Sequence, residues 1–180
     1  MLDAIFRRGN VSNRWSRDFG LALVVDLLTP SLNSIGLGAA VDEFSFLGRS
    51  TSKFKTPLEF EDIGVSIDNE DDGTVSGFQI IFNDLESGFS SFPGTVLLNG
   101  TVVLPTAIVK ELGDPYWRDE DEFEIVRFYE FATYEIQVVQ TLKGDLERLI
   151  VSNDHLMGDA EQRRAYGVDK PWPPNWAREN

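Results

Sequence analysis

The stretch that decides the fold is Val96-Leu-Leu-Asn-Gly-Thr-Val-Val-Leu-Pro105, in which an Asn-Gly pair separates two short apolar runs. Asn-Gly is the strongest two-residue signal for a β-hairpin, because both residues tolerate a positive φ. A related pattern occurs earlier, in Asp26-Leu-Leu-Thr-Pro-Ser-Leu-Asn-Ser-Ile35, where a Leu-Leu pair precedes the turn candidate Thr29-Pro30. The two stretches predict an internal repeat.

Each of these stretches is followed by a short helical pattern that ends in Leu-Gly. The first pattern covers residues 37–48 and the second residues 105–113, and both place apolar residues on one helical face. Gly48 and Gly113 fit the left-handed position that follows the last helical residue. We therefore expect one short helix in each copy.

Alternating apolar and polar residues follow each helical pattern. The alternation covers residues 57–67 in the first copy and residues 123–131 and 134–139 in the second. A glycine turn and a last strand then occupy residues 73–82 and 144–152. Period-two alternation is typical of antiparallel strands with one covered face. The fold class is α+β, with two tandem helix plus antiparallel β-meander units that can share one continuous curved sheet.

This pattern divides the chain into four segments. Residues 1–24 form an N-terminal arm or strand, 25–92 the first α+β unit and 93–155 the second. Residues 156–180 form a C-terminal helix and a tail rich in Pro and Trp. The apolar run 19–28 is interrupted by Asp and too short to span a bilayer, so we interpret it as a buried strand or short helix.

The helix stop Leu112-Gly113-Asp114-Pro115-Tyr116-Trp117 resembles a known pattern. It is similar to the Leu-Gly-x-Pro helix ending in the tandem units of the β-lactamase inhibitor protein and of the small outer-membrane assembly lipoproteins. The resemblance covers residues 25–152, although Leu47-Gly48-Arg49-Ser50 lacks the proline, and the lipidated cysteine of the lipoproteins is missing. It implies a helical segment packed on a curved antiparallel sheet, in proteins that mostly bind other proteins and are not enzymes.

Composition excludes several classes of site. The 180 residues contain no Cys and one His, which rules out disulfides, zinc–thiolate sites and thiol nucleophiles, and we expect no cofactor. The net charge of −14 disfavours nucleic acid and anionic membranes and favours a basic protein as partner. The lack of Cys fits a reducing compartment, so we expect a cytoplasmic location.

Two acidic runs are candidate sites. Asp68, Glu70 and Asp72 have the spacing of calcium ligands, but the twelfth position of that loop is Gln79, where a bidentate Glu is needed. A solvated turn explains the same run. The second run, 119–124, could provide paired carboxylates for acid–base chemistry, although solvated surface is the simpler interpretation.

The remaining candidates are aromatic. Tyr116, Trp117, Tyr166, Trp172 and Trp176 are predicted to be exposed binding residues, because Trp and Tyr dominate the energetics of protein interfaces. The alternative is that the tail lays its tryptophans on its own sheet.

No catalytic residue is predicted, and His155 is interpreted as a structural or surface histidine because no nucleophile motif accompanies it. The leading hypothesis is a bacterial, non-catalytic protein-binding module, inhibitor-like or immunity-like. The alternatives are a hydrolase that uses Asp and Glu and a sheet cavity that binds a small ligand.

Overall fold

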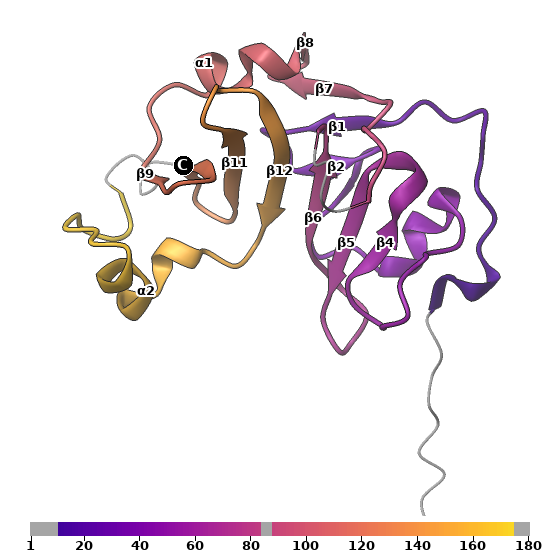
Figure 1. Ribbon diagram of the computed structural model, residues 1–180. Coiled ribbons are helices and arrows are strands. Elements are labelled where there is room, and N and C mark those ends of the chain that lie inside the picture. Colours follow the sequence, from indigo (N-terminus) through magenta and orange to yellow (C-terminus); the bar gives the residue numbers. More distant parts are fainter. Residues whose placement is uncertain (1–10, 84–87, 175–180) are drawn as a thin grey trace, which may run out of the picture.

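The computed structural model describes residues 11–83 and 88–174, in which two β-sheets are connected by short helices (Figure 1). Almost all strand pairs are antiparallel, and strands outnumber helices. The broad prediction of an α+β fold with antiparallel sheets is confirmed. The strands do not form one sheet, however, but two.

The smaller sheet contains the two hairpin stretches that were compared in the sequence. Its strand order is β3-β2-β1-β7-β8. The members are β1 (Val24–Asp26), β2 (Ser31–Leu32), β3 (Ile35–Gly36), β7 (Thr95–Leu98) and β8 (Thr101–Val103). The strands β1 and β7 are parallel neighbours, with Val25 opposite Val96. This parallel pair was not expected from the alternation pattern.

The turns of this sheet agree with the sequence in one copy only. Asn99 and Gly100 have φ values of 52° and 69° and connect β7 to β8, as predicted. In the first copy Thr29 and Pro30 lie in a four-residue turn, residues 27–30, between β1 and β2, whereas the tight two-residue turn is Asn33-Ser34, between β2 and β3, with φ values of 53° and 65°. Proline cannot adopt a positive φ, whereas Asn tolerates one, so the tight turn forms at the asparagine.

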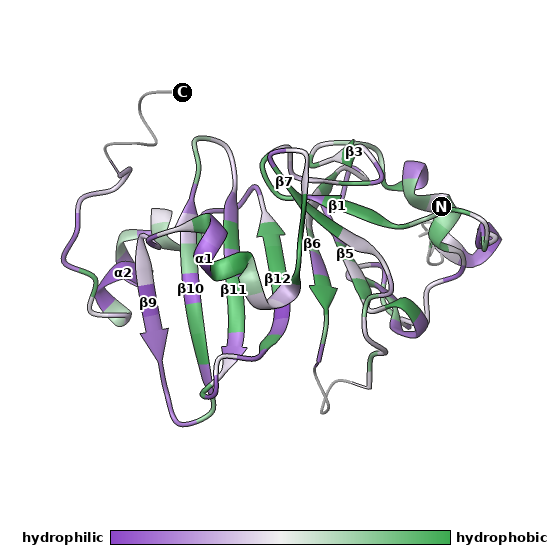
Figure 2. Cartoon of the chain, turned by 90° about the horizontal axis from the view of Figure 1, so that it is seen from above, coloured by the Kyte–Doolittle hydropathy of each residue, from purple (hydrophilic) through white to green (hydrophobic). Residues whose placement is uncertain are grey.

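The larger sheet joins strands from both halves of the chain. Its order is β4-β5-β6-β12-β11-β10-β9, with β6 and β12 side by side near the centre of Figure 2. The members are β4 (Leu58–Phe60), β5 (Val65–Asn69), β6 (Val75–Ile81), β9 (Trp117–Glu120), β10 (Glu124–Glu130), β11 (Glu135–Thr141) and β12 (Leu146–Ser152). Buried Ile80 and Leu149 lie opposite each other across the β6–β12 pair.

The strand pattern over residues 57–67 forms two short strands and not one continuous strand. The 3-10 turn η3 (Glu61–Ile63) and Gly64, with φ 63°, fold this segment back, so that Phe60 pairs with Val65. Ile63 and Val65, on either side of Gly64, are both fully buried. The same alternation of apolar and polar residues would also occur in one continuous strand, so it did not indicate this turn.

The helices are short and mostly of the 3-10 type. They are η1 (Val11–Arg14), η2 (Val41–Leu47), η4 (Pro105–Ala107), α1 (Ile108–Leu112), η5 (Leu156–Gly158) and α2 (Ala160–Ala165). The buried face of η2 is Val41, Phe44 and Leu47, as the spacing predicts. Gly48 and Gly113 end the two helices with positive φ, but their ψ values of −161° and −145° are extended and not left-handed helical.

Two apolar clusters hold the fold together. The main cluster takes residues from both halves of the chain, including the fully buried Phe44, Phe78 and Leu149. A smaller cluster around Tyr116 and Phe128 lies on the other face of the larger sheet, where α2 packs, whereas α1 lies on the main-cluster face (Figures 1 and 2).

The N-terminal prediction is partly wrong. Only Val24–Asp26 of the apolar run 19–28 forms a strand, and Phe19 is exposed. Trp15 instead packs parallel to Phe60, with ring centroids 6.4 Å apart. No helix in the described ranges is both long enough and apolar enough to cross a membrane.

Candidate functional site

The aromatic residues of the second half gather in the smaller cluster. Tyr116 is 2% exposed, so the prediction that it is exposed is wrong. Its ring meets Trp172 edge-on at 5.9 Å, and Tyr166 meets Phe128 in the same way at 5.8 Å. The C-terminal segment thus covers one face of the larger sheet, which is the alternative that the sequence allowed.

Further contacts fasten this segment. The Tyr116 hydroxyl donates to the Lys170 carbonyl at 3.2 Å, and Lys170 Nζ donates to the Tyr116 carbonyl at 2.9 Å. Lys170 Nζ also lies 5.7 Å from the Trp117 ring centroid. Trp176 lies outside the described residues. A role of these aromatic side chains in binding another protein stays a prediction.

The first acidic run forms a hairpin turn between β5 and β6. Asp72 Oδ1 accepts hydrogen bonds from Thr74 N at 2.9 Å and from Thr74 Oγ1 at 2.7 Å, which lowers the pKa of Asp72. Asp68 is partly buried, which raises its pKa, and Glu70 is exposed. Within the described ranges, no three or more His, Asp or Glu side chains are arranged to hold a metal ion.

The second acidic run forms the turn between β9 and β10. Asp121 Oδ1 accepts from the amides of Phe123 and Glu124 at 2.7 and 2.9 Å, and these bonds lower the pKa of Asp121. Glu120 pairs with Arg118, and Glu124 pairs with Arg148 at 2.9 Å. These carboxylates shape a turn and its ion pairs, and they do not line the pockets described next.

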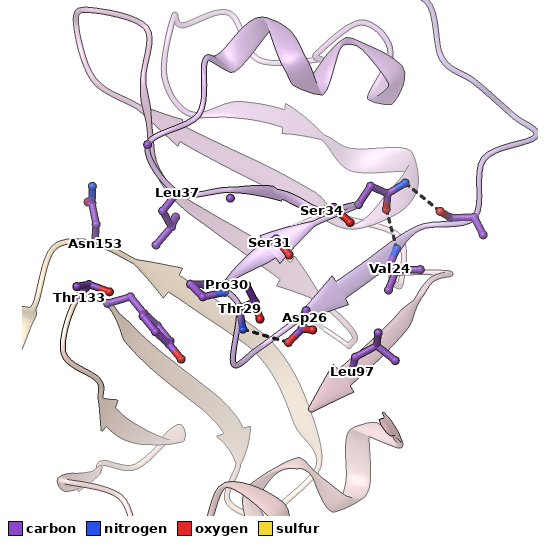
Figure 3. Close-up of a pocket in the computed structure, with 15 residues that line it drawn as sticks. Val24, Asp26, Thr29, Pro30, Ser31, Ser34, Leu37, Leu97, Thr133 and Asn153 are labelled. Carbon is purple, nitrogen blue, oxygen red and sulfur yellow. Dashed lines mark hydrogen bonds between the residues drawn. The ribbon is translucent and has the colours of Figure 1, made fainter. Parts of the chain in front are cut away.

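A pocket of about 910 Å³ opens between the smaller sheet and the turn that joins β10 to β11 (Figure 3). Its polar groups mostly serve the local backbone. Asp26 Oδ1 accepts from the amides of Leu28 and Thr29, and Asn33 bonds to Val24 N and Ala22 O. The Tyr134 hydroxyl donates to the Leu28 carbonyl at 3.1 Å. The pocket is large enough for a small ligand but shows no convergent reactive groups.

A groove of about 620 Å³, in which most of the lining residues are apolar, lies beside β8, the last strand of the smaller sheet. Three of the side chains that line it are unusually exposed: Leu28 at 41%, Val102 at 63% and Leu104 at 67%. Glu111 of α1 adds an exposed carboxylate to the rim. We call these four residues the edge groove.

The most deeply buried charges lie under the C-terminal segment. Glu130 at the end of β10 is directly opposite Glu135 at the start of β11, and they are 2% and 1% exposed. Glu130 Oε2 is 2.7 Å from Nδ1 of His155. Gln137 Nε2 donates to Glu135 at 2.7 Å. Glu130 Oε1 is buried without a hydrogen-bond partner.

This arrangement raises the pKa values of both carboxyls into the neutral range. Burial raises the pKa of Glu130 from its ordinary 4.5 to about 7, and the neighbouring Glu135 carboxyl acts in the opposite direction. Burial and the neighbouring Glu130 raise the pKa of Glu135 to about 8. Burial lowers the pKa of His155, although Glu135 and Asp154 act to raise it. Two adjacent buried carboxyls cannot both ionise cheaply.

Sequence reasoning missed Glu130 and Glu135 and interpreted His155 as merely structural. A signal was present, since the two glutamates flank the turn 131–134 at facing ends of two neighbouring strands. Their burial, however, depends on the distant C-terminal segment.

The fold and these features define a mostly-β member of the α+β class with a polar cluster buried beneath its C-terminal segment. No family model matches the chain, and no curated protein matches it. Among solved structures, the chain is similar to a DUF4309 family protein, YjgB, from Bacillus subtilis. The two are 16% identical, the match covers 67% of this chain and 83% of that chain, and the TM-score is 0.44.

Proposed function

We propose that this chain is a bacterial, non-catalytic protein-binding module, inhibitor-like or immunity-like, that acts in the cytoplasm. It binds an extended segment of a basic partner protein along the free edge of β8. The observation that carries this proposal is the edge groove, where exposed apolar side chains flank a strand edge that has no second neighbour in the described residues.

The backbone of β8 supports strand addition. The two-residue Asn99-Gly100 turn makes Leu98 and Thr101 a hydrogen-bonded pair, so Val102 occupies the next, non-hydrogen-bonded position. The N–H and C=O of Val102 therefore point away from β7. An added strand can pair with these groups, while its alternate side chains enter the apolar groove.

The charge of the chain selects the partner. A net charge of −14 attracts a basic segment and repels an acidic one, and Glu111 places one carboxylate beside the groove. In a bound strand where Lys or Arg alternates with apolar residues, the basic side chains would pair with Glu111 at the rim, and the apolar side chains would pack in the groove.

The proposal includes two tandem units, residues 25–92 and 93–155, related to the units of the β-lactamase inhibitor protein. Support comes from the adjacent, parallel strands β1 and β7 and from the central pairing of β6 with β12, the last long strand of each proposed unit. In this interpretation each unit presents one hairpin in the smaller sheet.

The pocket in Figure 3 supports a second candidate function, the binding of a small ligand. Its volume of about 910 Å³ is within the range of ligand sites. A fragment screen by NMR should then shift the signals of Leu97 and Tyr134, and a screen without such shifts would remove this candidate.

The strand-addition proposal is tested with displayed ten-residue peptides selected on the full chain. We expect enriched peptides in which basic and apolar residues alternate. Val102→Pro removes only an outward amide, which an edge position tolerates, and should weaken their binding about tenfold or more because the peptide carbonyl loses its donor. Val102→Thr keeps the amide and is the matched control. Fluorescence anisotropy measures the affinities.

Two results would contradict the proposal. The first is the recovery of peptides that bind the wild type and Val102→Pro equally well. The second is a selection that yields acidic peptides or no peptides at all. Thermal melts of both variants verify that the fold is retained.

A further inference from the structure

We propose that Glu130, Glu135 and His155 form a proton-controlled latch that holds the C-terminal segment, residues 156–174, on the outer face of the larger sheet and loosens as the pH rises. Three structural features support this proposal. They are the position of the two carboxyls, the packing of the C-terminal segment beside them, and the buried Glu130 Oε1, which has no hydrogen-bond donor.

The position of the carboxyls comes from the sheet itself. Directly opposite residues of an antiparallel pair point to the same face, so Glu130 and Glu135 meet on the side that the C-terminal segment covers. The side chain of Glu130 is completely buried.

The cover begins at the histidine. His155 lies three residues after the end of β12, contacts Glu130, and packs against Trp172 with ring centroids 5.1 Å apart. Met157, two residues later, is fully buried, and its amide points to Glu135 Oε2 at 3.5 Å. The segment thus touches both carboxyls at its start, and Trp172 packs on the histidine that contacts Glu130.

The unpaired oxygen of Glu130 indicates that the neighbouring Glu135 carboxyl carries a proton. Glu130 Oε1 is buried and has no N–H or O–H partner unless the adjacent Glu135 carboxyl carries a proton. Two protons shared among Glu130, Glu135 and His155 make the cluster neutral, whichever groups hold them. Loss of one leaves a net negative charge in a covered site, which is costly.

The charged side chains next described lie near Glu130, Glu135 and His155, but none places a positive charge against the two carboxyls. Asp154 adds negative charge beside His155. The guanidinium of Arg163 in α2 donates to the Met157 and Gly158 carbonyls, at 2.6 and 2.9 Å. Lys170 is held by the Tyr116 carbonyl, and the hydroxyl of Tyr116 stays neutral because burial raises its pKa.

The direction of the pH effect follows from the carboxyls. Their pKa values of about 7 and about 8 lie above the ordinary 4.5, so the closed form binds more protons than the open form in this range. Their contribution to closure is complete below pH 4.5 and is lost as the pH rises to 8. The lowered pKa of His155 acts in the opposite direction only below pH 6.5, whereas the carboxyls lose their protons around pH 7 to 8.

Hydrogen exchange on the full chain tests the latch. The protection of amides in residues 156–174, corrected for intrinsic exchange, should fall about tenfold or more between pH 5.5 and 8.5, since one pKa unit corresponds to a factor of ten. Protection of β6 and β12 should stay constant. Glu135→Gln should flatten the pH dependence, whereas Glu122→Gln, at an exposed turn, should leave it unchanged.

A measurement on the wild type keeps the test independent of any variant. Carbon-13 NMR of the glutamate carboxyls should show two that titrate between about pH 6 and 9, near the raised values given above. The proposal is overturned if all glutamates titrate near 4.5. It is also overturned if two titrate late but the protection of residues 156–174 does not follow them.

Discussion

At the residue scale, Gly64 is the position that admits the least change. Its φ of 63° is left-handed, and a Cβ there would lie 2.4 Å from the Ser90 carbonyl and 2.8 Å from the Ile81 carbonyl. The Gly64 carbonyl also accepts the Ile81 amide at 2.8 Å, which holds the backbones close together. The turn between β4 and β5 thus needs both the conformation and the small size of glycine.

We expect Gly64→Ala to lower the free energy of unfolding by about 1 kcal/mol for the positive φ and by a further 1–3 kcal/mol for the backbone clash. Gly73→Ala is the matched control, since its φ is 86° but its Cβ would enter open space. Urea denaturation of both variants measures the difference. If both variants lost the same free energy of unfolding, the predicted clash of the Gly64→Ala Cβ with the backbone would be contradicted.

At the element scale, the two-turn helix α2 is too short to be stable by itself and depends on its ends. Asp159 Oδ1 accepts the amides of Glu161 and Gln162 at 2.5 and 3.1 Å, and these bonds lower the pKa of Asp159. Arg163 ties the helix to the carbonyls before it. The helix carries Tyr166, at its end, onto Phe128.

Asp159→Ala removes both capping bonds, and we expect the amides of Glu161 and Gln162 to lose several-fold of their exchange protection because N-cap acceptors stabilise the first turn. Asp159→Asn keeps an acceptor oxygen and should retain most of the protection. NMR-detected hydrogen exchange resolves the two amides. Unchanged protection in Asp159→Ala would mean that tertiary packing alone holds α2.

At the scale of the whole molecule, the main apolar cluster joins both halves of the chain. It includes Val25 and Phe78 from the first half and Ile108, Ile136 and Val151 from the second. The β6–β12 pair crosses the same boundary with five paired residues on each strand. Neither half buries its apolar face without the other.

The shared cluster predicts one cooperative unfolding transition for the described fold. Far-ultraviolet circular dichroism and tryptophan fluorescence should give the same urea midpoint, because Trp15 reports on the first half and Trp117 and Trp172 on the second. Residues 25–92 expressed alone should not fold. Two separate midpoints, or a folded fragment, would contradict a common core.

Short-range features were the ones that could be predicted from the residues. The Asn99-Gly100 turn, the buried face of η2 and the last strands of each half all depend on φ preferences or on periodicity within a few residues. The turn at η3 was not predicted. Apolar residues before and after it are buried alike, so the alternation pattern did not show that the chain folds back there.

By itself, the sequence determined the α+β class, most strand positions and the acidic surface, because composition and local conformational preference suffice for these. Only the tertiary structure decided that β1 lies parallel to β7, that β6 meets β12, and that residues 156–174 bury Glu130 and Glu135. These depend on contacts between residues far apart in the chain, and burial, which sets the protonation of a carboxyl, is a property of the whole packed molecule.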